Sequence, residues 1–466
     1  MADNHLNAVK GPLKKAAIDA YMKSEGWFVP DAKGYNHYED GNPDGSDTVT
    51  MPDANGNGGG NWQSNKLREW LWNWNEDPKY HDAFDKIRQR VDKALEPWED
   101  LPDPTAFDEY IEHLRGANSK LAVSFSASDG VAVGAGPIGD YLKTIDQNAS
   151  SMSGGMINTF KKKFLNALGR AIGGHHGLTV ILGQALTGEQ NLIKQARADV
   201  TTAVTTYTKA LEAYAHDTSS NAAFAFKVIG AVVAGASAFA TGGATAAFGG
   251  AAAVLTLLTT LAEEDEKAAK EAKEAKEPEA KDYQGLMKGF ETALNDLNTA
   301  IKAREGTIAT SLSKNRESVY NYRDSFNLTN PIENIDDDSD LHEGDGRAII
   351  HNHSLAREIT HHAMPGIADE LKKAAEAVWD GWNGSPYYRD PTIGRGETGP
   401  YPEWSELADP TWRLIGDLEW EVRNGAKTLE LAIEDMGRTD TDSQDALEKH
   451  AASINGYQNY EVPKPE

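Results

Sequence analysis

Cysteine is absent from this 466-residue chain. The chain therefore has no disulfide, no thiolate metal ligand and no cysteine nucleophile. Positive charge is also scarce, because 46 Lys and Arg residues stand against 72 Asp and Glu residues, for a formal net charge of −26. Such a charge repels nucleic-acid phosphates and anionic lipid headgroups, so we expect no nucleic-acid partner and a chain kept soluble by self-repulsion.

The sequence has neither a recognisable N-terminal export signal nor a known catalytic motif. The N-terminal sequence MADNHLNAVKGPLKKAAIDAYMKSEGW has no continuous apolar stretch followed by a small-residue cleavage site, so we expect no Sec-type signal peptide. A secreted form would use another export route, and otherwise the protein would be cytoplasmic. The chain also lacks a nucleophile elbow, a P-loop and a dinucleotide fingerprint, so we expect no enzyme, no cofactor and no small-molecule substrate.

One central block, residues 228–262, has no charged residue and is rich in Ala and Gly. Gly242 and Gly243 divide it into two legs, each shorter than the about 20 residues that a bilayer-spanning helix needs. We expect a helical hairpin buried in a bundle, with a membrane-inserting hairpin or a permanent anchor as alternatives. Its core or membrane contacts are expected at Val228, Ile229, Val232, Val233, Phe239, Gly242, Gly243, Phe248, Val254, Leu255, Leu257 and Leu258.

Apolar residues recur every three or four positions on both sides of this block. The pattern runs from Ile193 to Tyr214 before the block and from Phe290 to Phe326 after it, as in the seam of a coiled coil. Antiparallel pairing of these two helices would put the apolar hairpin at or near one end of a rod. The charged stretch 263–282 has Glu and Lys at helical spacing, which favours a solvated helix.

The remaining patterns divide the chain into four parts. Residues 1–62 form a loop-rich N-terminal segment, 63–335 a long-helix bundle, 336–353 an acidic linker and 354–466 a C-terminal helical module. We expect a helix that starts at Asp103 and a helix break at Gly173 and Gly174. In the C-terminal module we expect helices at about 354–380, 409–436 and 442–453.

No stretch has a convincing strand pattern, and the Gly-, Asn- and Asp-rich residues 29–61 are expected to form a loop. The predicted fold class is therefore all-α, an elongated bundle of long helices with an apolar Ala/Gly-rich helical hairpin.

Two clusters of ligand-type residues are candidate metal sites. The loops at 40–45 and 53–58 fit the first half of a calcium loop, but Met51 and Ser64 stand where its bidentate Glu is needed. Since Gly, Asn and Asp are also common turn residues, calcium stays open. The histidines at 351–362 lack zinc-ligand spacing, and His175 with His176 is expected in a turn, so we expect no metal.

Two short motifs lie in the C-terminal third. Trp379 and Gly381 form a W-x-G motif after a predicted helix, where Gly would take a reversed backbone and Trp would cover the apolar seam. A simple helix end with a core Trp is the alternative. Tyr457 and Glu461 fit the pattern Y-x-x-x-[DE] after the last predicted helix, and the same pattern recurs from Tyr21 to Glu25 and from Tyr320 to Asp324.

Together these motifs resemble the WXG-type helical-hairpin substrates of type VII (ESX) secretion. The wider chain, with an Ala/Gly block between heptad helices, is similar to the larger all-helical, EspB-like relatives of that system. The resemblance implies export without a Sec signal, with Tyr457 and Glu461 as the export signal and Trp379 and Gly381 as the turn motif. It also implies protein partners or self-assembly.

Two other functional classes remain open at this point. The order of helix, apolar hairpin, charged helix and helix is also that of an α-helical pore-forming toxin, whose hairpin would enter a membrane through residues 228–262. An acidic helical rod also suits a phage or other assembly component. The sequence leaves the partner and the number of subunits undefined.

Overall fold

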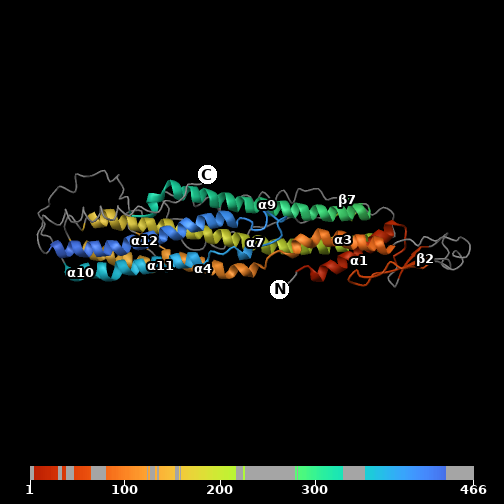
Figure 1. Cartoon of the computed structure of the whole chain (residues 1–466), viewed down its shortest axis with the longest axis horizontal. Helices are drawn as coiled ribbons and strands as arrows, with labels where there is room; N and C mark the ends of the chain where they lie inside the picture. The colour runs from red at the N-terminus through yellow and green to blue at the C-terminus, as the bar shows by residue number, and fades with distance from the viewer. Residues whose placement is uncertain are drawn as a thin grey trace, which may run out of the picture.

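The protein is an elongated bundle of long helices, seen here in a computed structural model (Figure 1). The fold class is all-α, as predicted. The structure describes residues 5–29, 34–37, 47–63, 80–122, 124–125, 132–133, 136–152, 157, 159–216, 224–225, 279–280, 282–328 and 352–436. The predicted hairpin 228–262, the helix 442–453, Tyr457 and Glu461 lie outside these residues, as does all of the acidic linker but its last two positions.

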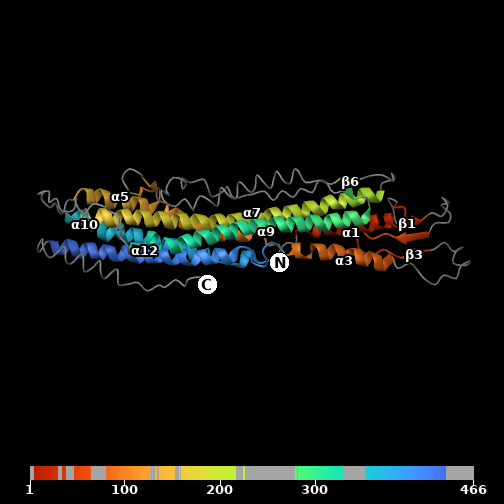
Figure 2. The same ribbon diagram turned by 90° about the horizontal axis from the view of Figure 1, so that it is seen from above.

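Two long antiparallel helices form the spine of the rod, α7 (Asn166–His216) and α9 (Tyr283–Asn321). At about 1.5 Å per residue, the 51 residues of α7 extend over about 77 Å. Near one end Tyr207 packs on Phe290, with ring centroids 5.6 Å apart, and at the other end the His175 ring lies 5.6 Å from that of Phe326. The two heptad-patterned segments thus pair antiparallel (Figure 2).

The chain leaves α7 and returns to α9 at the same end of the rod. Strand β6 (Phe224–Ala225) follows α7, and strand β7 (Glu279–Ala280) precedes α9. The two strands pair antiparallel, with Phe224 opposite Ala280. The segment 226–278, which contains the uncharged block, therefore begins and ends at one point beside that end of the spine.

One half of the rod is built on the N-terminal part of α7. The helices that pack there are α4 (Asp108–Leu121), α5 (Pro137–Ser150), the consecutive helices α10 (His353–Arg357), η8 (Glu358–Ala363) and α11 (Met364–Asp380), and α12 (Tyr401–Met436). α11 and α12 form a helical hairpin that shares one apolar core with α4, α5, α7 and α9. The short π-helical turn η3 (Phe160–Leu165) leads into α7, and β4 (Ser124–Phe125) pairs with β5 (Ala132–Val133) nearby.

The other half has its own apolar core around the C-terminal part of α7. It contains α1 (Asn7–Ser24), α3 (Tyr80–Glu99) and a small antiparallel sheet of β1 (Gly34–His37), β2 (Asp47–Thr50) and β3 (Trp62–Gln63). The prediction of loop alone over 29–61 was therefore wrong. Strands this short have too few alternating residues to stand out among turn residues, yet Tyr35 and Val49 are fully buried.

Helix boundaries agree with the predictions in one case and differ in another. Asp103 caps the turn η2 (Pro104–Phe107) that leads into α4, since its carboxylate accepts the backbone N–H of Thr105 at 2.9 Å. The predicted helix start at 409 was wrong, because α12 begins at Tyr401 and contains Pro410. Packing of α12 on α11 and α9 outweighs the local preference against proline.

The predicted helix break at Gly173 and Gly174 is also wrong, because α7 continues through both residues. A Cβ on Gly174 would lie only 2.8 Å from Cε1 of Phe326, so glycine is needed here for close packing and not for a turn. His175 and His176, predicted in a turn, are consequently buried side chains of α7. His175 Nε2 lies 2.9 Å from the carbonyl oxygen of Phe326, in the turn η6 (Arg323–Phe326) that follows α9.

The buried His175 makes the folded state sensitive to acid. Its Nδ1 has no hydrogen-bond partner, and burial lowers the pKa of the imidazole to about 4. A lowered pKa contributes stability that is present above the unfolded value of about 6.5 and is lost as the pH falls through 4. Between pH 7 and pH 4 the wild type should lose about 3 kcal/mol more unfolding free energy than His175→Gln, which keeps a donor for Phe326. Denaturant titrations of both proteins at each pH measure this difference, and parallel pH curves would contradict it.

None of the helices in the described part of the chain combines the length and apolar character needed to cross a bilayer. The uncharged block 228–262 lies outside the described residues, so this statement does not extend to it.

Candidate functional site

A buried cluster of charged side chains separates the two apolar cores at the middle of the rod. On α7, Glu189 lies between Leu186 of one core and Leu192 of the other. On α9, Glu305 lies between core residues in the same way, in the apolar seam that the sequence pattern picks out. Both carboxylates are fully buried. Charges almost never occupy such positions unless they are paired, so their partners define the site.

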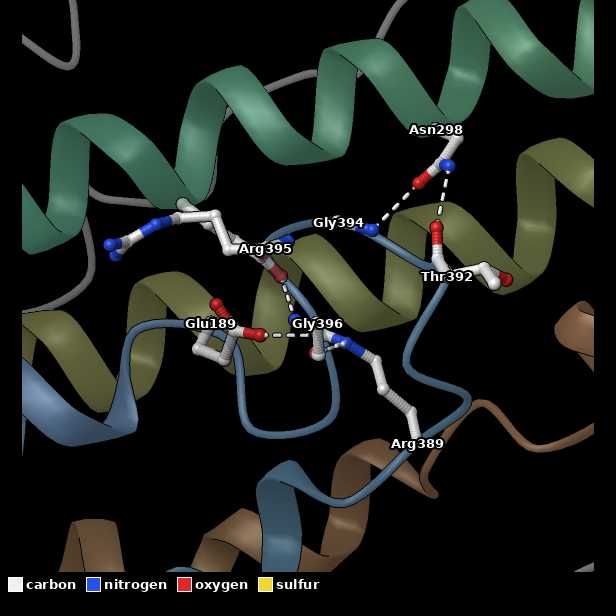
Figure 3. A network of polar contacts seen from close by, with 8 residues as sticks. Glu189, Asn298, Arg389, Thr392, Gly394, Arg395 and Gly396 are labelled. Atoms are coloured by element: carbon white, nitrogen blue, oxygen red, sulfur yellow. Dashed lines mark hydrogen bonds and ion pairs between the residues drawn. The ribbon is translucent and has the colours of Figure 1, made fainter.

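A single arginine joins the two helices. Arg389, in the connection 381–400 between α11 and α12, donates from Nη1 to Oε1 of Glu189 at 2.9 Å and from Nη2 to Oε1 of Glu305. All three side chains are fully shielded from solvent. Figure 3 shows the Arg389 side chain extending from the connection to Glu189 on α7. The planar fork of arginine suits this bridging role, because its N–H groups diverge toward two separate acceptors.

The connection itself is fastened to α9 through its backbone. The backbone N–H of Arg395 donates to Oε2 of Glu305 at 2.6 Å. Asn298 accepts the N–H of Gly394 at 2.6 Å through Oδ1 and donates from Nδ2 to the carbonyl of Thr392 at 2.8 Å (Figure 3). The Glu305 carboxylate and the Asn298 amide, two turns apart on α9, therefore hold one loop in a defined path.

Two glycines allow this close approach. Gly394 and Gly399 have φ values of +61° and +51°, in the left-handed region that favours glycine. A Cβ at Gly394 would lie 2.3 Å from Oε2 of Glu305, and one at Gly399 would lie 2.4 Å from Nη2 of Arg389. Glycine at these two positions therefore lets the backbone of the connection pass close to Glu305 and Arg389.

The cluster holds two carboxylates against one guanidinium, which leaves one excess negative charge if both carboxylates are ionised. Burial, together with the neighbouring charge of Glu189, raises the pKa of Glu305 to about 8, although Arg389 acts in the opposite direction. Oε2 of Glu189 is buried without a hydrogen-bond partner, and so is the hydroxyl of Tyr387. A proton kept between the two carboxylates would neutralise the cluster and give the Glu189 oxygen a partner.

Sequence reasoning missed this cluster. Glu305 follows Ile301 and precedes Ile308 at the spacing of the apolar seam, so a charge in a seam position was the available signal. Nothing local marks Glu189 or Arg389 as its partners, because they lie far from it in the chain.

The W-x-G motif lies where α11 ends and the chain turns back toward α12. Gly381 has φ −74°, so the predicted reversed backbone is wrong. A Cβ at Gly381 would lie 3.3 Å from the Ala377 carbonyl oxygen and 3.4 Å from Leu114 Cγ, so α4 packs closely against this residue. Trp379 does not cover the apolar seam as predicted, nor is it a core residue, since its side chain is 54% exposed.

Trp379 instead belongs to an aromatic group on the α11–α12 hairpin. Its ring centroid lies 5.1 Å from that of Trp412 on α12 and 5.5 Å from that of Trp382. Trp382 Nε1 donates to the hydroxyl of Ser405 at 3.0 Å. The three tryptophans therefore tie the turn after α11 to the first part of α12.

The metal candidates resolve into ordinary contacts where they are described. Oδ1 of Asp53 accepts the backbone N–H groups of Asn55 and Asn57 at 2.8 Å each, which makes the loop 53–58 a self-capped turn. His361 pairs with Glu430 at 3.1 Å. Within the described residues no group of three or more His, Asp or Glu side chains is placed to hold a metal ion. The other candidate loop, 40–45, lies outside those residues.

Comparison of the chain with protein-family models, with characterised proteins and with solved structures gives no significant match. Neither a family nor a function therefore follows from likeness to another protein.

Proposed function

We propose that this protein is a non-enzymatic helical rod that acts by self-assembly or by binding a protein partner, and that it is exported like a type VII (ESX) secretion substrate. The observation that carries the proposal is the α11–α12 hairpin. Its two helices pack against each other, and the motif of Trp379 and Gly381 lies at the turn between them. Helix, W-x-G and helix are the features by which the sequence resembles that family.

The position of the aromatic group supports a binding role. Trp379 is more than half exposed although it contacts two other tryptophans, so the group presents apolar surface to solvent. Exposed tryptophans contribute strongly to protein interfaces when a partner covers them. The central ion cluster is closed to solvent, which suits a structural role and not the binding of a substrate.

Export should depend on the C-terminal Y-x-x-x-E motif. Replacing Tyr457 and Glu461 with alanine should reduce the secreted fraction at least tenfold, because the export apparatus would no longer recognise the signal. Secretion is measured by immunoblotting culture filtrate and cell pellet in a host with a type VII system. Unchanged export would reject the assignment of the signal.

Two other matches to the pattern provide controls. Tyr21 lies in α1, where its ring packs 5.8 Å from that of Tyr283, and Tyr320 lies in the last turn of α9. Tyr320→Phe is the better control, since it keeps the aromatic ring. It should leave both export and the melting temperature close to wild type, whereas equal loss of export in both proteins would point to a folding defect.

A pore-forming protein is the second candidate, and the pairing of β6 with β7 favours it. The chain on either side of the uncharged block is held together at one end of the spine, which would let the block act as a single unit. Leakage of a dye from liposomes tests this function directly. Leakage that is abolished by replacing Val232 and Leu257 with aspartate would favour the pore-forming function over the secretion-substrate function.

A further inference from the structure

We propose that Glu189, Glu305 and Arg389 form a proton-dependent clasp. The clasp holds the connection 381–400 on the α7–α9 spine while the two carboxylates share one proton. When that proton is lost, the clasp releases the connection. The clasp joins three elements and lies where the two apolar cores meet. It is independent of the proposed export and assembly functions.

The first argument is the count of charges in a closed space. One guanidinium contacts two carboxylates, and none of the three side chains reaches solvent. An uncompensated charge in such a place is costly, because neither water nor a second cation screens it. With one proton between the carboxylates the cluster is neutral and every charge is paired.

The second argument is the position available for that proton. Three of the four carboxylate oxygens accept hydrogen bonds, two from Arg389 and one from the backbone N–H of Arg395. The fourth, Oε2 of Glu189, is buried and has no donor. The two carboxylates lie within hydrogen-bonding reach of each other, so one proton between them gives this last oxygen its partner.

Within the described residues, Arg389 is the one cation that forms an ion pair with Glu189 or Glu305. The connection contributes Tyr387 and Arg389, and the start of α12 contributes Tyr401. From η2 the neighbouring side chain is the apolar ring of Phe107, which packs on Tyr387 at 5.2 Å. The side chain of Arg395 turns away and pairs with Glu403 at 2.6 Å.

Loss of the proton should release the connection, and linkage between protonation and stability fixes the direction of this pH effect. Because the pKa of Glu305 is raised to about 8, the stabilisation is complete below the unfolded value near 4.5 and is lost as the pH rises through 8. Opening of the connection should become easier by about tenfold for each pH unit between 4.5 and 8, and should level off above 8, where both states have lost the proton. The backbone contacts of Asn298 and Glu305 with the connection should open with it.

Hydrogen–deuterium exchange of the full-length protein tests the clasp. In the wild type, the protection of amides in 385–400, corrected for the intrinsic pH dependence of exchange, should fall about tenfold between pH 7 and pH 9. Glu189→Gln should remove this fall. Its amide oxygen can still accept from Arg389, and its NH₂ group takes the position of the orphaned oxygen as a permanent donor.

Glu406→Gln is the matched control, since Glu406 pairs with Arg316 at the surface and should leave the pH profile as in the wild type. A wild-type profile that is flat between pH 7 and pH 9 would overturn the clasp, and so would a Glu189→Gln profile that still falls tenfold. Failure of Glu189→Gln to fold, judged by circular dichroism, would also count against it. The reason is that Gln is a neutral isostere of protonated Glu, so the closed site should accommodate Gln at position 189.

Discussion

Replacing Arg389 with methionine should lower the free energy of unfolding by roughly 3–5 kcal/mol, the cost of breaking a fully buried ion pair. The change leaves two buried carboxylates without their common partner. It also removes the hydrogen bond that Nε of Arg389 donates to the carbonyl of Gly396. Urea denaturation at pH 7, followed by circular dichroism, measures the loss. Adding Glu189→Gln to this variant should recover part of it, because one uncompensated carboxylate is removed.

Arg395→Met is the matched control for this prediction, because both arginines belong to the same connection. Arg395 engages Glu305 through its backbone, which the substitution keeps, while its side chain forms a partly exposed pair with Glu403. Pairs of this kind contribute about 0–1 kcal/mol. If the two variants were equally destabilised, charge burial at Arg389 would not explain the effect.

Replacing Trp404 with alanine should lower the free energy of unfolding by roughly 3–5 kcal/mol, as for other fully buried large side chains. Trp404 is 0% exposed in the core shared by α12 and α7, and its Nε1 donates to the carbonyl of Leu182 at 3.0 Å. The substitution leaves a cavity and removes the hydrogen bond from Nε1 to the Leu182 carbonyl on α7. The midpoint of urea denaturation should therefore move well below that of the wild type.

Trp379→Ala is also a Trp-to-Ala substitution, but here we expect little loss of stability. Its side chain is more than half exposed, so the free energy of unfolding should change by less than about 1 kcal/mol. Under the proposed function, its effect should appear in assembly or partner binding, measured by light scattering after size-exclusion chromatography. A large loss of stability in Trp379→Ala, with unchanged assembly, would assign the aromatic group to the fold instead.

The clasp is the place where we expect the rod to open locally. The two apolar cores lie on either side of the clasp along α7 and α9. Between them the α11–α12 connection is held by polar contacts to Glu189, Glu305 and Asn298. Polar contacts of this kind respond to pH, whereas apolar packing does not. Local opening there would alter how the α11–α12 hairpin is seated while leaving the spine intact.

The amino-acid sequence by itself determined the all-α class, the two heptad-patterned helices of the spine and the helix start at Asp103. These features depend on the spacing of apolar residues and on capping groups a few positions away, which are local properties. The sequence resemblance to type VII secretion substrates stays a prediction, since Tyr457 and Glu461 lie outside the described residues.

Only the tertiary structure decided the continuity of α7 through Gly174, the small sheet and the ion cluster. Gly174 stays helical because Phe326 packs against it, and Arg389 reaches carboxylates that lie 84 and 200 positions away in the chain. With 72 acidic residues in the chain, no local pattern marks Glu189 as a partner of Arg389. Whether a charge is paired or solvated depends on what the fold brings beside it, and that contact is long-range.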